Sequence, residues 1–146
     1  MSAAHTALRI CRADYGNSAH ARALVYALDA YARDPMGGSQ PLSQFARDHL
    51  VQSLAALPQA FSVLAFYGSD ENNLDQVAGL VNCLEGFSTF ACRPLVNVHD
   101  LAVLPTYRGR GVGAGMLALV EQLALERGAC KLTLEVLQGN AAAMRL

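Results

Sequence analysis

The sequence has no uninterrupted apolar run close to the ~20 residues that a membrane-spanning helix needs. Its first ten residues, MSAAHTALRI, lack the charged segment and the long apolar segment of a secretory signal peptide. Neither sign of charge is in excess, since 11 Lys and Arg stand against 12 Asp and Glu. These absences argue against a membrane protein, a secreted protein and a surface that attracts nucleic acid through bulk charge. We therefore expect a cytoplasmic protein.

Cysteine pairs at metal-binding or redox spacing are missing as well. The four cysteines (Cys11, Cys83, Cys92 and Cys130) are scattered and include no C-x-x-C pair. This distribution predicts reduced thiols that are mostly buried, and it predicts no metal site.

Apolar residues are abundant enough for a substantial core. They make up 53% of the 146 residues, and no repeat, low-complexity tract or domain boundary divides the chain. Hydrophobic periodicity predicts one mixed α/β domain over 1–146 with the order β-α-α-β-β-β-α-β-α. The predicted strands cover 8–13, 61–68, 76–90, 94–105 and 131–136, and the predicted helices cover 17–34, 42–58, 112–127 and the residues from 140. Asn17 or Ser18 is the expected cap of the first helix, and Ser43 that of the second.

The helix predicted over 112–127 begins unusually, after the segment YRGRGVGAG at 107–115. Glycine disfavours helix, arginine repels the positive end of the helix dipole, and no Ser, Asp or Asn caps the first turn. Glycines do let consecutive backbone N–H groups face a ligand, and a helix N-terminus adds positive charge. The loop therefore indicates a phosphate site to which Arg108 and Arg110 add charge, with a solvated loop as the alternative.

Three phosphate-binding patterns can be compared with this loop. A P-loop requires Gly-Lys-Ser/Thr, whereas Gly113 is followed by Ala114. The dinucleotide pattern G-x-G-x-x-G/A is met at Gly109, Gly111 and Ala114, but too few residues follow for the rest of that fold. The pattern R-x-x-G-x-G is met at Arg108, Gly111 and Gly113, between an apolar strand and an amphipathic helix.

The segment HDLAVLPTYRGRGVGAGML resembles the acetyl-CoA-binding motif of the GNAT-superfamily N-acetyltransferases, in which Q/R-x-x-G-x-G/A wraps the pyrophosphate of CoA. LAV and KLTLEV resemble the family's fourth and fifth strands. NAAAMRL resembles the start of its N-x-x-A-x-x-L-Y helix, with Asn140, Ala143 and Leu146 in register. The resemblance implies a GNAT-like acyl-CoA N-acyltransferase fold, a mixed α+β sheet with flanking helices. It divides the chain into an acceptor-side half, 1–94, and an acetyl-CoA-binding half, 95–146.

The resemblance also implies acetyl-CoA as the co-substrate. The backbone around Leu101 and Val103 would bind the pantetheine arm as an added strand, and the N–H of Val103 would polarise the thioester carbonyl. Asn140 would contact pantetheine or cap a helix, or do both. The residues expected to bind the cofactor are Leu101, Ala102, Val103, Arg108, Gly109, Arg110, Gly111, Val112, Gly113, Ala114 and Asn140.

The reaction that the resemblance implies is direct attack of a primary amine on the acetyl thioester in a ternary complex. An ammonium ion cannot attack, so a base must remove its proton. Period-two alternation predicts that His99 shares one face of the fourth strand with Asn97, Leu101 and Val103, whereas Asp100 points to the other face. His99 is one candidate for the base, and Glu85 is a second candidate or an amine anchor. A structural role is the alternative for each of them.

The family's motif continues with a tyrosine that protonates the departing CoA thiolate, but Leu146 is the last residue here. The family's sixth and seventh strands are also missing, so we expect a C-terminally incomplete domain.

The alternative to an enzyme is a non-catalytic acyl-CoA-binding or regulatory module. The expected partner is a small-molecule or peptide amine, with no nucleic acid and no membrane, and a homodimer is left open. A single RGRG copy in an apolar context is unlike RNA-binding segments.

Overall fold

The computed structural model describes residues 7–134 of the chain. Its elements are β1 (Leu8–Arg12), α1 (Ser18–Arg33), α2 (Gln44–Ala55), β2 (Ala60–Tyr67), β3 (Val77–Ser88), β4 (Arg93–Val103), α3 (Val112–Glu126) and β5 (Leu132–Leu134), with short 3-10 turns at Pro35–Gly37, Leu74–Gln76 and Pro105–Tyr107. The predicted order of elements is confirmed through β5, and the helix predicted from 140 lies outside the described residues. None of the described helices is long and apolar enough to cross a membrane.

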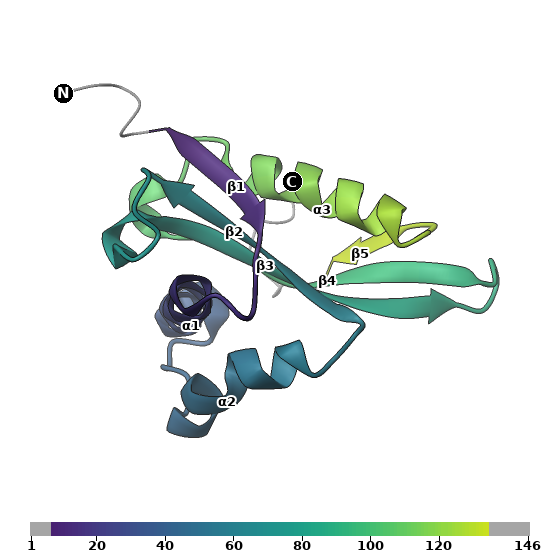
Figure 1. Ribbon diagram of the computed structural model, residues 1–146, viewed down its shortest axis with the longest axis horizontal. Coiled ribbons are helices and arrows are strands. Elements are labelled where there is room, and N and C mark those ends of the chain that lie inside the picture. Colours follow the sequence, from purple (N-terminus) through teal and green to yellow (C-terminus); the bar gives the residue numbers. More distant parts are fainter. Residues whose placement is uncertain (1–6, 135–146) are drawn as a thin grey trace.

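The strands form one sheet in the order β1-β2-β3-β4-β5. The first three pairings are antiparallel, whereas β4 and β5 are parallel. A parallel pair needs a crossover connection, which α3 supplies. Helices α1 and α2 cover one face of the sheet and α3 covers the other, while the hairpin that joins β3 to β4 extends beyond both layers (Figure 1). The crossover therefore brings the glycine loop to the end of β4.

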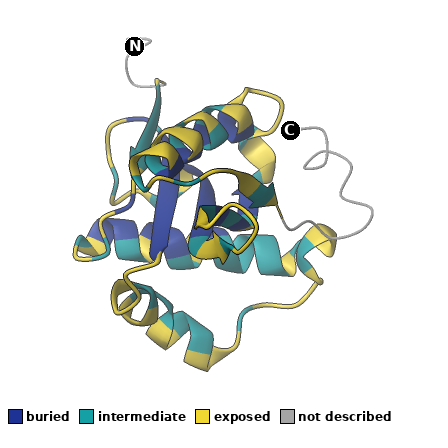
Figure 2. Cartoon of the chain, turned by 90° about the vertical axis from the view of Figure 1, so that its right-hand side faces the viewer, coloured by how far each residue is buried: buried dark blue, intermediate teal, exposed yellow. Residues whose placement is uncertain are grey.

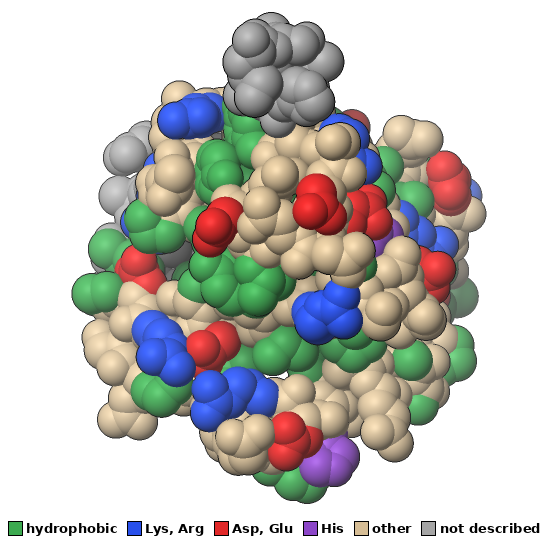
Figure 3. Space-filling model, turned by 60° about the vertical axis from the view of Figure 1, so that its left-hand side comes forward, with side chains coloured by type: hydrophobic (Ala, Val, Ile, Leu, Met, Phe, Trp, Pro, Cys, Tyr) green, Lys and Arg blue, Asp and Glu red, His purple; other side chains and the backbone are tan. Residues whose placement is uncertain are grey.

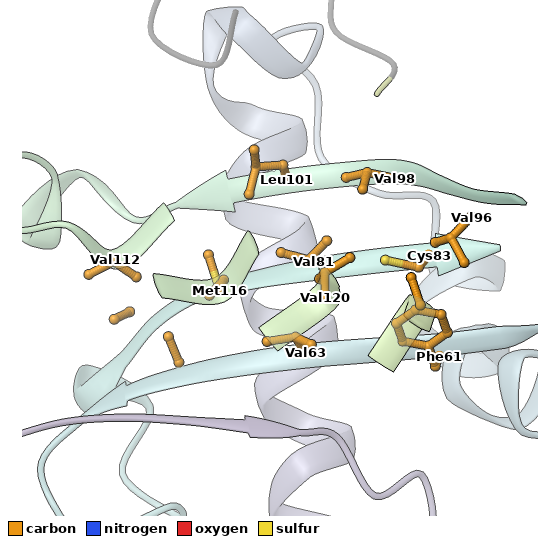
Figure 4. Close-up of a cluster of buried hydrophobic side chains, with 13 residues drawn as sticks. Phe61, Val63, Val81, Cys83, Val96, Val98, Leu101, Val112, Met116 and Val120 are labelled. Carbon is orange, nitrogen blue, oxygen red and sulfur yellow. The ribbon is translucent and has the colours of Figure 1, made fainter. Parts of the chain in front are cut away.

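Apolar side chains fill most of both faces of the central strands, which is why the sequence of β2, AFSVLAFY, is apolar except for Ser62. On the α3 face, Phe61 and Val63 pack with Met116 and other side chains of α3 (Figure 4). On the α1 face, Leu64 and Phe66 pack against helix α1. Figure 2 shows the buried residues concentrated along the central strands and the inner sides of the helices. The two clusters hold the sheet between its helical layers.

Two predicted helix caps are confirmed. The side chain of Asn17 accepts hydrogen bonds from the backbone of Ala19 and His20, and that of Ser43 accepts one from Ala46. These bonds satisfy amides that a helix N-terminus otherwise leaves without partners.

The cysteine prediction is met only in part. All four thiols are free, as expected, but they differ in burial. Cys83 is buried, which raises its pKa to about 12, and Cys11 is partly buried. Cys92 and Cys130 are exposed, so the expectation of mostly buried thiols was wrong for those two.

A β-bulge in β4 overturns the predicted alternation. Asn82 of β3 lies opposite Asp100, but its neighbour Cys83 lies opposite Val98, so His99 is an extra residue in β4. Consequently Val98 and Leu101 both pack on the α3 face although three positions separate them. The prediction that one face carries Asn97, His99, Leu101 and Val103 was therefore wrong, because strict period-two counting cannot cross an extra residue.

The core on the α3 face predicts a large cost for truncating Met116, which is 0% exposed. We expect Met116→Ala to lower the free energy of unfolding by about 2–5 kcal/mol, measured by urea denaturation, because it leaves a cavity under α3. Leu125→Ala on the same helix is the control, since Leu125 is 67% exposed and should cost far less. Equal losses in the two variants would contradict this assignment of the core.

Candidate functional site

The glycine loop forms the N-terminus of α3. Gly109 and Gly111 have φ of 77° and 78°, in the left-handed region that favours glycine. Gly111 is the N-cap residue of α3 and provides no side-chain hydrogen bond to the first turn. A Cβ added at either glycine would meet nothing within 4 Å. The loop therefore has free space beside it, and the α3 amides can face an anion without obstruction by a cap.

Arg108 connects this loop to two other elements. Its Nε donates to the carbonyl oxygen of Val103 at 3.0 Å, and its guanidinium forms an ion pair with Asp34 at 3.1 Å. Asp34 lies in the connection between α1 and α2, where the backbone N–H of Met36 and the Arg108 guanidinium lower its pKa. The connection between the first two helices is thereby held against the glycine loop.

Arg110 lies beside a pair of tyrosines. The rings of Tyr67 and Tyr107 are stacked, with centroids 5.1 Å apart and an interplanar angle of 5°. The guanidinium of Arg110 lies 5.5 Å from one centroid and 5.7 Å from the other. Stacking orients a guanidinium while its edge can still donate to an anion. Sequence reasoning missed Tyr67, since no local signal brings the end of β2 to this loop.

The strand segment before the loop is held firmly along β3. Leu101 and Val103 lie opposite Val81 and Gly79, where a Cβ on Gly79 would come within 2.7 Å of the Ala102 carbonyl oxygen. On the other edge of β4, Val96–Val98 pairs with Leu132–Leu134. The structure thus places the predicted pantetheine-binding segment directly before the glycine loop, as expected. Asn140 lies outside the described residues.

The two predicted candidates for the base lie in different surroundings. His99 is exposed at the β-bulge, two positions before Leu101. Glu85 forms an ion pair with Arg127 at 3.1 Å, and this guanidinium also lies 4.7 Å from the centroid of the Phe61 ring. Arg127 follows the C-terminal end of α3, about 22 Å along that helix from the glycine loop. The structure therefore brings His99, and not Glu85, to the strand segment that leads into the loop.

A second cluster, Cys11, His20 and Glu71, has possible ligand atoms within 4.8 Å of one another. Nδ1 of His20 accepts a hydrogen bond from the backbone N–H of Asp14 at 2.9 Å, and Nε2 lies 3.0 Å from Glu71. Because Nδ1 acts as the acceptor, Nε2 carries the proton and has no lone pair for a metal. Burial also raises the pKa of the Cys11 thiol. The three side chains therefore form a hydrogen-bonded packing contact rather than a metal site.

A hollow of about 440 Å³ lies between α1 and α2. Its lining residues are Ala21, Arg22, Val25, Tyr26, Arg47, Asp48, Val51, Gln52 and Leu74. Figure 3 shows hydrophobic side chains mixed with both signs of charge on the face that it presents, so this face has no single-sign patch. The glycine loop does not contribute to the hollow, which is separate from the site described above.

Comparison with known proteins identifies the family. Residues 25–146 match the Acetyltransferase (GNAT) family, so this chain belongs to it. A thialysine N-epsilon-acetyltransferase from Bos taurus is 38% identical over 60 residues, which are 41% of this chain and 35% of that protein. The matched region thus spans about a third of the length of this curated relative.

Solved structures share the fold at low sequence identity. An aminoglycoside acetyltransferase from an uncultured soil metagenomic sample has a TM-score of 0.75 and 17% identity, covering 94% of this chain and 83% of its own. A ribosomal-protein-alanine N-acetyltransferase from Brucella melitensis biovar Abortus 2308 has a TM-score of 0.73 and 18% identity, covering 95% and 87%. The predicted fold class, a GNAT-like α/β domain, is confirmed.

The pairing of Glu85 with Arg127 predicts energetic coupling. Both side chains are largely buried, with exposed fractions of 31% and 21%. We expect Glu85→Gln and Arg127→Gln each to destabilise the protein, and the double variant to lose about 1 kcal/mol less than the sum of the two. Thermal and urea unfolding of all four proteins measures this coupling. Strictly additive losses would mean that the ion pair does not contribute.

Proposed function

We propose that this chain is an acetyl-CoA-dependent N-acetyltransferase domain that transfers the acetyl group to a primary amine of a small molecule, peptide or protein. The observation that carries the proposal is the N-terminus of α3, which follows β4 directly and has two left-handed glycines and no side-chain cap. Membership of the GNAT family, whose acetyltransferases use acetyl-CoA, supports it. The alternative is a non-catalytic acyl-CoA-binding or regulatory module.

In this proposal the amides of 109–114 bind the pyrophosphate of CoA, where the helix dipole favours negative charge. The space beside Gly109 and Gly111 is open, since a Cβ at either position would meet no atom within 4 Å. A pyrophosphate could lie in this space, whereas a larger side chain at either position would fill part of it. Arg110, oriented by the two tyrosines, adds a charged donor, and Arg108 adds a second one beside Asp34. The pantetheine arm follows the backbone of Leu101–Val103.

The chemical step in the proposal is attack of the neutral amine on the thioester carbonyl, with loss of the CoA thiolate. The N–H of Val103 stabilises the developing oxyanion. His99 takes the proton from the acceptor amine, directly or through water, as its exposure next to Leu101 permits. Glu85 has no part in this step, because its carboxylate pairs with Arg127 at the far end of α3.

The acceptor is proposed as a primary amine, and three relatives suggest which amines to use as probes. Their names refer to thialysine, aminoglycosides and the alanine of a ribosomal protein. We also propose a cytoplasmic location, which the four free cysteines support. We propose no nucleic-acid or membrane partner, and we leave a homodimer open. The probe panel is therefore thialysine, an aminoglycoside and a peptide that begins with alanine.

The cofactor assignment is tested by titration calorimetry with acetyl-CoA, CoA and NAD. We expect binding of the first two, and Arg108→Ala and Arg110→Ala should each weaken acetyl-CoA binding by about tenfold, since a hydrogen bond to a charged group contributes roughly 1.5–3 kcal/mol. Arg93→Ala removes the same charge from the exposed start of β4 and should leave the affinity unchanged. Binding of NAD without CoA would overturn the proposal.

The transfer step is tested by following thiol release from acetyl-CoA with each amine of the panel. We expect release with at least one of them, and His99→Gln should lower kcat by about 10²-fold or more while leaving the acetyl-CoA affinity unchanged. Unaltered kcat in this variant would remove the base role from His99. Tight acetyl-CoA binding with no release for any amine would favour the regulatory alternative.

A further inference from the structure

Four polar side chains form a continuous hydrogen-bonded row on the α1 face of the sheet. The hydroxyls of Tyr15 and Ser62 are 2.8 Å apart, and the Ser62 hydroxyl donates to Oδ1 of Asn82 at 2.6 Å. Nδ2 of Asn82 then donates to Oδ2 of Asp100 at 3.1 Å. The row runs from the segment after β1 through β2 and β3 to β4. Ser62 and Asn82, at its centre, are 0% and 5% exposed.

The row has a single direction. The one proton of the Ser62 hydroxyl is used toward Asn82, so Tyr15 must donate to Ser62. The carbonyl oxygen of Asn82 faces Ser62, which leaves its amide group to donate to Asp100. Every donor therefore points toward the carboxylate, and each bond polarises the next in the dry interior of the sheet. This arrangement fixes one oxygen of the Asp100 carboxylate in place.

Asp100 differs from the other partly buried carboxylates near the sheet. Glu85 pairs with Arg127, Glu71 with Arg9 and Asp34 with Arg108. Within residues 7–134, no Lys, Arg or His nitrogen lies within ion-pair distance of Asp100. A cationic ligand at the second oxygen of this carboxylate would therefore meet no competing cation from the described residues.

Asp100 also lies next to the strand segment proposed for pantetheine. It directly precedes Leu101 in β4, and it lies on the face covered by α1. Tyr31 of α1 has a pKa raised by burial and then by the charges of Asp100 and Asp34, so both carboxylates lie within electrostatic range of its hydroxyl. Asp34 in turn contacts the glycine loop through Arg108. The carboxylate of Asp100 thus lies between the helical layer and the strand segment proposed for pantetheine.

We propose that Asp100 binds the ammonium group of the acceptor and that Asn82, Ser62 and Tyr15 act as positioning residues for it. The inference rests on the proposed transferase function and adds a recognition residue that period-two counting left without a role. Oδ2 is fixed by Asn82, and Oδ1 accepts a hydrogen bond from the ammonium ion. The amine enters as a cation, and its proton leaves to the base before the amine attacks the thioester. Acceptors whose reacting amine is cationic at neutral pH are therefore favoured.

The first test is Asp100→Asn, assayed with whichever amine of the panel the unaltered protein acetylates fastest. The substitution keeps the shape of the side chain and removes its charge. We expect the KM for the amine to rise at least tenfold, with the Kd for acetyl-CoA changed less than twofold. Glu121→Gln, which removes one exposed carboxylate from α3, is the matched control and should change neither quantity.

The second test concerns the positioning residues. It also tests the proposal in the case that the Asp100→Asn variant does not fold. Tyr15→Phe and Ser62→Ala each break the row without touching Asp100. We expect each to raise the KM for the amine about three- to tenfold while kcat and the Kd for acetyl-CoA stay within twofold, and Ser62→Thr to restore the KM. A purely structural row would lower the melting temperature without this selective change in KM.

The outcomes separate the two proposals. Transfer that proceeds with an amine KM within twofold of the unaltered value in both Asp100→Asn and Ser62→Ala would overturn the role of Asp100 and leave the transferase function standing. Absence of acetyl-CoA binding in the unaltered chain would overturn the proposed function, and the role of Asp100 with it. A selective rise of the amine KM in these variants, absent in Glu121→Gln, supports both.

Discussion

The arrangement of the candidate site depends on one extra residue in β4. Because His99 is an extra residue in β4, the alternation of side chains changes phase between Val98 and Leu101. Leu101 therefore joins the core under α3, while Asp100 turns to the α1 face and meets Asn82. Without the bulge, alternation continued from Val98 would put Asp100 on the α3 face and Leu101 on the α1 face, which exchanges the two sides.

The two faces of the sheet then have different physical roles. On the α3 face, apolar packing around Met116 fixes the helix, and with it the direction of the uncapped amides at its N-terminus. On the α1 face, apolar packing is interrupted by Ser62 and Asn82, whose polar side-chain atoms each have a hydrogen-bond partner. A buried polar pair is tolerated only when it is satisfied in this way, and its last hydrogen bond holds one oxygen of Asp100 toward Asn82.

Local signals in the sequence predicted most of the fold, and long-range contacts account for what they missed. Periodicity and capping residues such as Asn17 and Ser43 act within a few residues, and the glycine pattern marked the loop. The bulge at His99 depends on pairing with a strand about 17 residues away, and alternation alone gives no sign of it. The pairs Glu85–Arg127 and Arg108–Asp34 join residues 42 and 74 positions apart, so no local pattern could have indicated them.

The ion pair between Arg108 and Asp34 links the cofactor-binding and acceptor-side halves that the family resemblance implies. Arg108 is 51% exposed, so this pair by itself contributes little stability. The same side chain also donates from Nε to the carbonyl oxygen of Val103, at the end of β4. Asp34 accepts a further hydrogen bond from the backbone N–H of Met36, so its carboxylate is held on two sides. One arginine therefore joins the end of β4, the glycine loop and the connection between α1 and α2, which are the elements on which the proposed cofactor and acceptor sites depend.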